Sequence, residues 1–374
     1  MSRKLRMGMV GGGPGAFIGE VHRIAARMDG EADLVSGVFG RDAAKSAAFA
    51  EGLHLAPGRG YADYKEMIQK ELALPEGERI DFVTICTPNF CHYEIAKAFL
   101  EAGFHVVCEK PLAMNSAEAV ALEALVKKTG KMFCLFHNYT GYPMVRQARQ
   151  LIADGVLGKI RKINVEYSLG WLAAPNAGKQ AAWRVDPKQA GISGCMADIG
   201  THAQNIIEFI TGMPILEVSA DLAAFVPGRQ LDDDGSVLLR FADGVRGLIF
   251  ASEVATGEED NFIVKIYGDK AAIEWRQMEP ENLILRSNDA PVQIFHRGWP
   301  GTGEESARNS RLPAGHPEGF IEAFANIYRM FFEAVRTGVP GDYPSVAEGV
   351  AEMRFLAAIV ANSNGTEKWT KIPR

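Results

Sequence analysis

Two short stretches of the chain carry side chains that could stabilise a developing charge or move a proton. The first is Lys110, which follows the strand-like run 105–108 and stands between Glu109 and Pro111. A lysine at the carboxyl end of a parallel strand points into the crevice where open α/β sheets bind ligands. Its ammonium group could hydrogen-bond a substrate oxygen and stabilise an alkoxide. A solvated lysine after a strand is the simpler alternative.

Asp198 and His202 are the second group. They stand four positions apart within the run 191–205, and on a helix this spacing places both side chains on one face. A carboxylate beside an imidazole fixes its tautomer and supports it as a general base, which the oxidation of a hydroxyl group requires. A helix cap next to a surface histidine has the same spacing, so the pair alone does not establish a base.

The glycine-rich stretch near the start of the chain predicts a dinucleotide site. An apolar run breaks there into glycines and then into a helical pattern. Glycines suit such a turn because a Cβ would keep a pyrophosphate away from the backbone N–H groups of the helix. Two registers fit: Gly11-x-Gly13-x-x-Ala16 has the fingerprint spacing directly, whereas Gly19 as its last glycine would make residues 14–16 an insertion.

The end of the second predicted strand, 32–39, bears on the choice of cofactor. In dinucleotide-binding folds this position meets the adenosine ribose, and an acidic side chain there favours NAD. Gly40 and Arg41 follow the strand here. A small residue with a guanidinium group accommodates a 2′-phosphate, so we expect NADP to be somewhat favoured over NAD. The alternatives are that Arg41 stacks on adenine or lies in solvent. Asp42 is expected to cap the next helix.

These groups need elements to hold them, and hydrophobic periodicity predicts two architectures. Strands and helices alternate in the first half, which calls for a doubly wound parallel sheet with helices on both faces. After a strand at 160–167 the pattern becomes antiparallel and predicts an open, mostly antiparallel sheet with helices on one face. The polar run 302–310 predicts a loop, and helices are expected at 320–336 and from a cap at Ser345 to 362.

The length of 374 residues favours two domains. We expect an α/β protein with a dinucleotide-binding domain over residues 1–137. A substrate-binding and oligomerisation domain is expected over 138–374, with its last helices as candidates to pack back on the first domain.

The net charge bears on the kind of ligand that the protein binds, and the cysteine content bears on the redox state of its thiols. The net charge of −6 and the lack of a basic block argue against nucleic acid and anionic membranes, which leaves small molecules. Without a signal-peptide core or an apolar run near the roughly 18–20 residues of a membrane span, we expect a cytoplasmic protein. The five cysteines stand mostly in apolar contexts and predict buried reduced thiols, and no metal motif is present.

At two motifs the chain resembles a known family. Thr87-Pro-Asn-x-x-His92 and the run 102–112, Ala-Gly-x-His-Val-x-Cys-Glu-Lys-Pro-Leu, follow the opening glycine loop. Together they resemble the glucose-fructose oxidoreductase / inositol dehydrogenase / MocA family of NAD(P)-dependent oxidoreductases, over essentially the whole chain. The segment holding Asp198 and His202 is similar to the family pattern G-G-x-x-x-D-x-G-x-H, with Ser193 in place of the first glycine.

The resemblance implies hydride transfer between a nicotinamide and a secondary alcohol of a sugar, inositol or related polyol, in an active site between the two domains. In the oxidative direction His202 would take the hydroxyl proton, Lys110 would stabilise the alkoxide, and Asp198 would orient both groups or a second hydroxyl. Related enzymes differ over whether the lysine or the histidine accepts the proton, and that choice stays open. The expected cofactor contacts are Gly11, Gly13, Pro14, Ala16, Phe17, Ile18, Arg41, Thr87, Pro88, Asn89, His92, Glu109, Lys110 and Pro111. The expected substrate contacts are Lys110, Asn138, Tyr139, Trp183, Arg184, Asp198 and His202.

One departure from the family concerns the substrate. Relatives often carry arginines just after the position of Asn138, where this chain has Tyr139 and Thr140. An aromatic ring there suggests stacking on a sugar face. The open sheet is the usual oligomer surface in the family, so a homodimer or homotetramer is expected. Two rival functions are a glycosidase that uses NAD for transient oxidation and a catalytically silent dinucleotide-binding sensor.

Overall fold

The computed structural model describes residues 3–175 and 178–373. Contacts within it divide the chain into two compact units. The first unit comprises Met1–His137 and Phe324–Val350, and the second comprises Asn138–Ala323 and Ala351–Arg374. The chain therefore passes from one unit to the other three times, and each unit is described separately below.

The first unit is built on a five-stranded sheet in the order β2-β1-β3-β4-β5, and every neighbouring pair is parallel. Its strands are β1 (Leu5–Gly11), β2 (Ala32–Val38), β3 (Phe82–Cys86), β4 (His105–Glu109) and β5 (Phe133–Phe136). Its helical segments are α1 (Phe17–Met28), α2 (Ala43–Gly52), α3 (Tyr64–Ala73), η1 (Asn89–Cys91), α4 (His92–Glu101), α5 (Ser116–Thr129) and most of α11 (Phe320–Thr337). The predicted doubly wound parallel sheet is confirmed.

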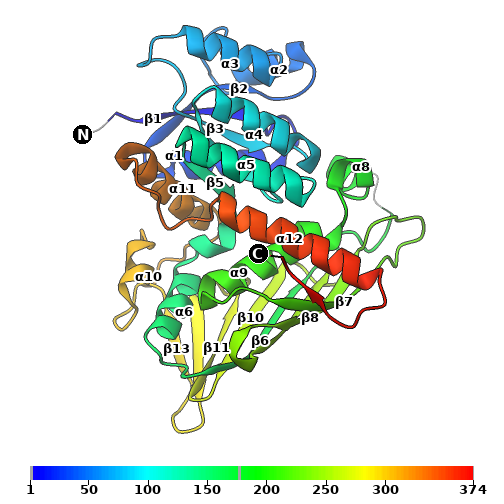
Figure 1. Ribbon diagram of the computed structural model, residues 1–374. Coiled ribbons are helices and arrows are strands. Elements are labelled where there is room, and N and C mark those ends of the chain that lie inside the picture. The colour runs from blue at the N-terminus through cyan, green and yellow to red at the C-terminus, as the bar shows by residue number, and fades with distance from the viewer. Residues whose placement is uncertain (1–2, 176–177, 374) are drawn as a thin grey trace. The chain divides into compact units, whose positions relative to one another are not determined.

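The central strand β3 shows why this sheet needs helices on its faces. All five residues of β3 are buried, as expected of a parallel strand covered on both sides. Phe82 and Thr84 point to the same face because side chains alternate along a strand. Phe82 contacts Phe331 of α11, with ring centroids 5.4 Å apart. Helices α4 and α5 lie side by side, and α4 packs against β3 and β4 (Figure 1).

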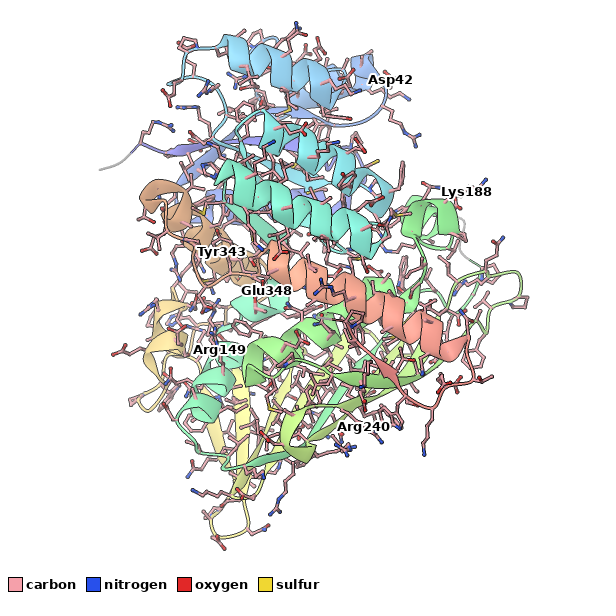
Figure 2. All side chains as sticks on the ribbon, viewed as in Figure 1. Asp42, Arg149, Lys188, Arg240, Tyr343 and Glu348 are labelled. Atoms are coloured by element: carbon pink, nitrogen blue, oxygen red, sulfur yellow. The ribbon has the colours of Figure 1, made fainter. Side chains whose placement is uncertain are left out.

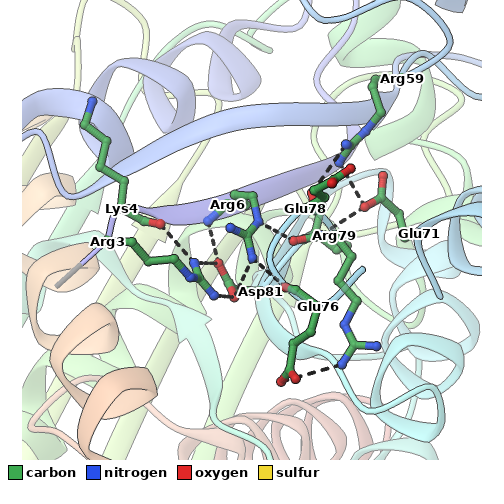
Figure 3. Close-up of polar contacts among 10 residues, drawn as sticks. Arg3, Lys4, Arg6, Arg59, Glu71, Glu76, Glu78, Arg79 and Asp81 are labelled. Atoms are coloured by element: carbon green, nitrogen blue, oxygen red, sulfur yellow. Dashed lines mark hydrogen bonds and ion pairs between the residues drawn. The ribbon is translucent and has the colours of Figure 1, made fainter. Parts of the chain in front are cut away.

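A cluster of charges ties β1 to the segment before β3 (Figure 3). Asp81 accepts hydrogen bonds from the Arg3 guanidinium at 2.7 and 2.6 Å and from the backbone N–H of Arg6 at 2.7 Å. Burial alone would raise the pKa of Asp81, but these hydrogen bonds and the charges of the two arginines outweigh it and lower the pKa. The cluster lies at the amino ends of the strands, so it supports the fold rather than the ligand-binding edge.

The second unit is built on a nine-stranded sheet in the order β13-β12-β11-β10-β6-β9-β8-β7-β14. All neighbouring pairs are antiparallel except β6 and β9, which run parallel. The strands are β6 (Ile160–Ser168), β7 (Glu217–Ala223), β8 (Asp234–Arg240), β9 (Arg246–Ser252), β10 (Asn261–Gly268), β11 (Ala271–Arg276), β12 (Asn282–Ser287), β13 (Gln293–His296) and β14 (Thr370–Lys371). The predicted open, mostly antiparallel sheet is confirmed.

Helices cover one face of this sheet. Both α6 (Pro143–Ala153) and α9 (Thr201–Thr211) pack against its strands, and burial alternates along β8, where Val237 and Leu239 are buried while Leu238 is 47% exposed. The remaining helical segments are η2 (Asn138–Gly141), α7 (Lys179–Arg184), α8 (Pro187–Ala190), η3 (Met196–Gly200), η4 (Ala242–Gly244), α10 (Glu304–Arg308) and α12 (Val346–Ser363). Helix α12 is shared, since its residues up to Val350 belong to the first unit.

Capping residues place several helices where the sequence predicts them. Asp42, labelled in Figure 2, accepts a hydrogen bond from the N–H of Lys45 at 3.0 Å and begins α2 as expected. The Ser345 hydroxyl donates to Glu348 at 2.5 Å and accepts from Ala347, which starts α12 at Val346.

The prediction of a loop at 302–310 is wrong in part, because this segment contains the short helix α10. Polar and glycine content suggested a loop, but Ser306 is buried and α10 packs against α6. The N–H of Gly303 also donates to Gln147 Oε1 at 2.6 Å. A long-range contact therefore orders a segment whose local pattern is polar.

Candidate functional site

The glycine loop of the first unit is shaped by close backbone contacts. Strand β1 ends at Gly11 and α1 begins at Phe17, so residues 12–16 form the turn. A Cβ on Gly13 would lie 1.8 Å from the carbonyl oxygen of Phe39, and one on Gly11 would lie 2.5 Å from the carbonyl oxygen of Cys86. Neither neighbour can yield easily because both are backbone atoms, so these two positions require glycine.

The structure decides between the two registers of the fingerprint. Gly19 lies inside α1, and a Cβ there would come within 2.2 Å of the Cα of Gly12. This is the close helix–loop approach for which the last glycine of the fingerprint is needed. Residues 14–16 are therefore an insertion that lengthens the turn. Gly15, at its tip, has a left-handed φ of 73°.

Lys110 and Thr87 lie at the same edge of the parallel sheet as the glycine loop. Gly11 pairs with Cys86 in register, and Ile85 pairs with Cys108, so Thr87 and Lys110 come next on neighbouring strands. The order of strands reverses between β1 and β3, and such a switch point is where open α/β sheets bind ligands. Thr87 Oγ1 is buried there with no hydrogen-bond partner among the described residues.

His92, one of the expected cofactor contacts, supports this edge through contacts with backbone carbonyl oxygens. Its ring is fully buried, and its two nitrogens lie 2.8 Å from the carbonyl oxygens of Pro111 and Thr87. His92 thereby joins the segment after β3 to the segment that holds Lys110.

Glu109, another of the expected cofactor contacts, is largely buried and hydrogen-bonded within the first unit. Its carboxylate lies 2.8 Å from Nε2 of His22 on α1 and accepts from the N–H of Lys110 at 3.2 Å. His22 Nδ1 in turn lies 2.8 Å from the Tyr328 hydroxyl on α11. Burial would raise the pKa of Glu109, but the hydrogen bond from His22 and the charges of nearby groups lower it. The lowered pKa favours the ionised form of the Glu109 carboxyl group, which accepts the hydrogen bond from the backbone of Lys110.

The end of β2 presents the residues expected near the adenosine ribose. Gly40 and Arg41 are exposed, and no atom lies within 4 Å of the position that a Cβ on Gly40 would take. Pro14 and Phe17 are also exposed, Phe17 at 67%. This edge of the first unit therefore presents exposed residues along which a long ligand could lie.

In the second unit, Asp198 and His202 do not lie on one unbroken α-helix, which corrects the sequence prediction. Asp198 belongs to η3, a π-helical turn, and His202 lies in α9, which begins at Thr201. A π-turn inserts an additional residue and rotates what precedes it, and such turns are frequent at functional sites. The turn is held by Asp232, whose carboxylate accepts from the N–H groups of Gly194 and Met196 at 2.9 Å.

Asp198 is paired with Arg184, a residue that the sequence also predicted for the site. Arg184 Nε donates to Asp198 Oδ2 at 2.8 Å. The guanidinium carbon of Arg184 lies 4.4 Å from the ring centroid of Trp183 and 5.4 Å from that of Trp171, so two indole rings flank the guanidinium group. Cation–π contact and the ion pair together hold the guanidinium in one orientation.

Glu253 and Trp171 are site residues that the sequence reasoning missed. Glu253 follows β9, is 2% exposed, and accepts a hydrogen bond from Trp171 Nε1 at 3.3 Å. Burial first, then the charge of Asp198 and a hydrogen bond with it, raise the pKa of Glu253 well above its ordinary value. The one available signal was a carboxylate directly after an apolar strand.

Tyr139 packs beside His202, so its expected stacking on a sugar is not supported. The tyrosine is 4% exposed, and its ring meets His202 edge-on with centroids 4.9 Å apart. Its hydroxyl lies 2.5 Å from that of Tyr167, whose ring stacks on Phe262. Tyr139 therefore orients the imidazole. Asn138 is buried, and its Nδ2 has no hydrogen-bond partner among the described residues.

The described part of the chain contains no group of three His, Cys, Asp or Glu side chains placed to hold a metal ion. Its five cysteines are free thiols, and four of them are buried. None of the described helices combines the length and the apolar character needed to cross a membrane.

Comparison with known proteins shows the family to which the chain belongs. The NAD-binding Rossmann-fold model of the oxidoreductase family matches residues 5–137, and the GFO/IDH/MocA C-terminal domain model matches residues 145–274. The chain is 36% identical over 385 residues to the uncharacterized oxidoreductase YfiI of Bacillus subtilis, covering 99% of this chain and 98% of YfiI. It is 29% identical over 325 residues to a levoglucosan dehydrogenase of Pseudarthrobacter phenanthrenivorans, covering 79% and 80% of the two chains.

Solved structures give the same result. Two crystal structures of an inositol dehydrogenase homologue from Azotobacter vinelandii are 32% and 31% identical to this chain, with TM-scores of 0.96 and 0.93. Each match covers 99% of this chain and 98% of the other. One is complexed with NAD+, and the other with NADH and myo-inositol. The chain described here belongs to the glucose-fructose oxidoreductase / inositol dehydrogenase / MocA family of NAD-binding oxidoreductases.

Proposed function

We propose that this oxidoreductase transfers a hydride between a nicotinamide cofactor and a secondary alcohol carbon of a sugar, inositol or related polyol. The observation that carries the proposal is that each of the two units holds side chains suited to one part of this chemistry. Lys110 directly follows strand β4 at the edge that bears the glycine loop in the first unit, and the second unit holds Asp198, Arg184 and His202, with two indole rings flanking Arg184. The names of the relatives, which include an inositol dehydrogenase homologue and a levoglucosan dehydrogenase, support this substrate class.

The residues of the first unit fit a dinucleotide. Gly13 and Gly11 leave space that any Cβ would fill, and the buried Thr87 Oγ1 is a polar atom that a ligand could satisfy. The backbone N–H groups at the start of α1 would hold the pyrophosphate, since a helix N-terminus favours an anion. When bound, the nicotinamide supplies the carbon that accepts or gives the hydride. The proposed cofactor contacts are the expected set: Gly11, Gly13, Pro14, Ala16, Phe17, Ile18, Arg41, Thr87, Pro88, Asn89, His92, Glu109, Lys110 and Pro111.

The remaining side chains have separable roles in this proposal. In the oxidative direction His202 takes the proton of the reacting hydroxyl. Its ring is suited to this role because it is largely buried and is oriented by edge-on contact with Tyr139. The Lys110 ammonium hydrogen-bonds the same oxygen and stabilises the alkoxide charge. Asp198 accepts a hydrogen bond from a substrate hydroxyl, with Arg184 fixing its position. Trp183 offers an apolar ring surface of the kind on which sugars stack, and Asn138 offers an amide donor.

The proposal is tested by a dehydrogenase screen over inositols, aldoses, glucosides and anhydrosugars, with NAD+ and NADP+ in parallel. We expect net formation of reduced cofactor with at least one member of this set. Cleavage of a glycosidic bond without net reduction would instead reveal a glycosidase that recycles its cofactor. Tight binding of the dinucleotide without turnover of any polyol would contradict the proposed function.

The choice of cofactor gives a separate prediction. We propose that NADP is somewhat favoured, because Arg41 is exposed beside the unhindered Gly40 and no acidic side chain directly follows β2. Arg41→Ala should therefore weaken NADP binding more than NAD binding, by the loss of a charge-assisted contact to the 2′-phosphate. Titration of each cofactor against wild type and variant measures this. A wild type that binds NAD at least about tenfold more tightly than NADP would contradict the assignment.

The open face of the second unit gives a prediction about assembly. Leu238, Tyr267 and Ile294 are exposed by 47%, 39% and 52% on strands of the nine-stranded sheet. Apolar residues of this kind on a broad face are typical of a homo-oligomer interface. We expect a homodimer or homotetramer joined through the sheet, and Leu238→Glu should weaken it. Light scattering at micromolar concentration measures the mass, and a monomeric wild type would contradict this expectation.

A further inference from the structure

We infer that Arg23 is a positioning residue of the dinucleotide site, which holds the carbonyl oxygen of Gly12 and thereby directs the N–H of Gly13 toward the pyrophosphate of a bound cofactor. Its role rests on the cofactor site of the function proposed above and is independent of the polyol chemistry. The sequence alone did not single out Arg23, because an arginine on a helix is most often a surface residue.

The guanidinium group of Arg23 is half-buried and touches a backbone carbonyl, a sulfur atom and an aromatic ring within the first unit. Its Nη1 donates to the carbonyl oxygen of Gly12 at 2.7 Å and lies 3.6 Å from Met9 Sδ. Its central carbon lies 5.5 Å from the ring centroid of Phe49 in α2. These contacts hold the group in one place, and its charge strengthens the hydrogen bond to Gly12.

The packing of α1 brings Arg23 to the turn. A Cβ on Gly12 would lie 3.0 Å from the Cα of Gly19 and 3.5 Å from Arg23 Nη1. Gly19 and Arg23 stand four positions apart on α1, so they share one face of the helix. That face therefore contacts the turn through a glycine and, one helical turn later, donates a hydrogen bond to it.

The planarity of the peptide bond carries this contact to the next residue. The bond between Gly12 and Gly13 is trans, and in a trans peptide the N–H points away from the carbonyl oxygen. With the oxygen directed at Arg23, the N–H of Gly13 is directed away from it. Gly13 is buried, and no described residue accepts a hydrogen bond from this N–H. A buried N–H without a partner in the chain is one that a ligand can satisfy.

Arg23 and Arg41 should act on different parts of the cofactor. Arg41 is exposed after β2, where a 2′-phosphate is expected, whereas Arg23 Nη1 is directed at the backbone of the turn. The pyrophosphate is common to NAD and NADP. Loss of Arg23 should therefore weaken both dinucleotides to the same extent, in contrast to loss of Arg41.

Calorimetric titration of Arg23→Met with NAD+, NADP+ and ADP-ribose tests this role without any polyol. Methionine keeps the unbranched stem and removes the donors and the charge. We expect the affinity for each of the three ligands to fall by about tenfold, because each carries the pyrophosphate. Arg23→Lys keeps a charged donor on a shorter stem and should lose only about threefold. Arg27→Met is the matched control, since Arg27 lies one turn further along α1 with a side chain 79% exposed, and it should bind like the wild type.

Several outcomes of the titration would overturn the inference. Wild-type affinity in Arg23→Met is one. A loss confined to NADP+ is another, because it would mean that Arg23 contacts the 2′-phosphate itself. An equal loss in Arg27→Met is a third, since it would trace the effect to net charge. If Arg23→Met does not fold, Arg23→Lys decides the matter, and wild-type affinity for all the ligands then overturns the inference.

Phosphorus NMR of bound NAD+ gives a readout that a general loss of stability would not move. The chemical shifts of the pyrophosphate depend on the hydrogen bonds that its oxygens accept. At saturating cofactor these shifts should differ from those of the wild-type complex in Arg23→Met and Arg23→Lys, and should match them in Arg27→Met. Unchanged shifts in both variants of Arg23 would overturn the positioning role.

These readouts separate the role of Arg23 from the proposed reaction. An enzyme that oxidises no polyol, yet loses affinity for NAD+ and NADP+ equally in Arg23→Met, would disprove the proposed function and leave the role of Arg23 established. With a polyol found in the screen, the loss in Arg23→Met should appear in the KM for the cofactor rather than in kcat. A loss confined to kcat would overturn the inference while leaving the proposed function in place.

Discussion

Lys110→Met should lower turnover by about two to three orders of magnitude, the scale usual for the loss of one charge-stabilising donor. The lysine directly follows β4; its N–H donates to the Glu109 carboxylate, and the carbonyl oxygen of the next residue, Pro111, lies 2.8 Å from His92 Nδ1. Methionine keeps most of the aliphatic packing and removes the charge. Affinity for the dinucleotide should change little, because the glycine loop rather than this side chain holds the phosphates. Steady-state kinetics at saturating cofactor and substrate, with a cofactor titration, measures both.

The matched partner of this variant is His202→Ala. It should also lower turnover and should alter the pH dependence, since a proton acceptor is removed. The double variant should lose less than the product of the two single losses if, as proposed, both groups act on one oxygen. Full activity in the Lys110→Met enzyme would exclude the lysine from the mechanism and leave the family likeness as a likeness of fold.

Gly13→Ala should have the second large effect, on both cofactor binding and stability. Its Cβ would lie 1.8 Å from the carbonyl oxygen of Phe39, so the loop or the end of β2 must move. We expect the free energy of unfolding to fall by about 1–3 kcal/mol, the usual cost of overpacking. The shifted N–H groups should cost at least about tenfold in cofactor affinity, or about 1.4 kcal/mol.

Gly77→Ala is the control for this substitution. Gly77 is exposed, has no positive φ, and has no atom within 4 Å of an added Cβ. Its stability and cofactor affinity should match those of the wild type. Calorimetry and a fluorescence titration of both variants decide the matter, and wild-type affinity in Gly13→Ala would show that the turn is not the phosphate site.

The ligand-binding edge of the first unit could be predicted because its signals are local. Apolar runs followed directly by Thr87 and Lys110 identify the ends of β3 and β4, and parallel pairing then brings them to one edge. The register of the glycine loop could not be chosen in this way. It depends on the approach of Gly19 to Gly12, a contact between a helix and a turn that spacing alone does not reveal.

The candidate site of the second unit was only partly predictable, since its residues meet through tertiary contacts. Arg184, Asp198 and His202 stand in one stretch of sequence and were identified, but the π-turn between them leaves no mark in hydrophobic periodicity. Glu253 meets Trp171 because β6 and β9 pair in parallel inside an otherwise antiparallel sheet. Tyr139 was assigned to the substrate because nothing in the sequence showed its neighbours Tyr167 and Phe262.

The discontinuous make-up of the first unit affects how the protein matures during synthesis. Phe324–Val350 belong to this unit, and Tyr328 within them completes the hydrogen-bonded series through His22 to Glu109 behind Lys110. A nascent chain normally folds its amino-terminal part first as it leaves the ribosome. Here the strands of the parallel sheet emerge early, but the face of β3 that bears Phe82 is covered only after Phe331 of α11 has been translated. The core of the first unit can therefore be completed only after residues 324–350 have been translated, and these follow every strand of the second sheet except β14.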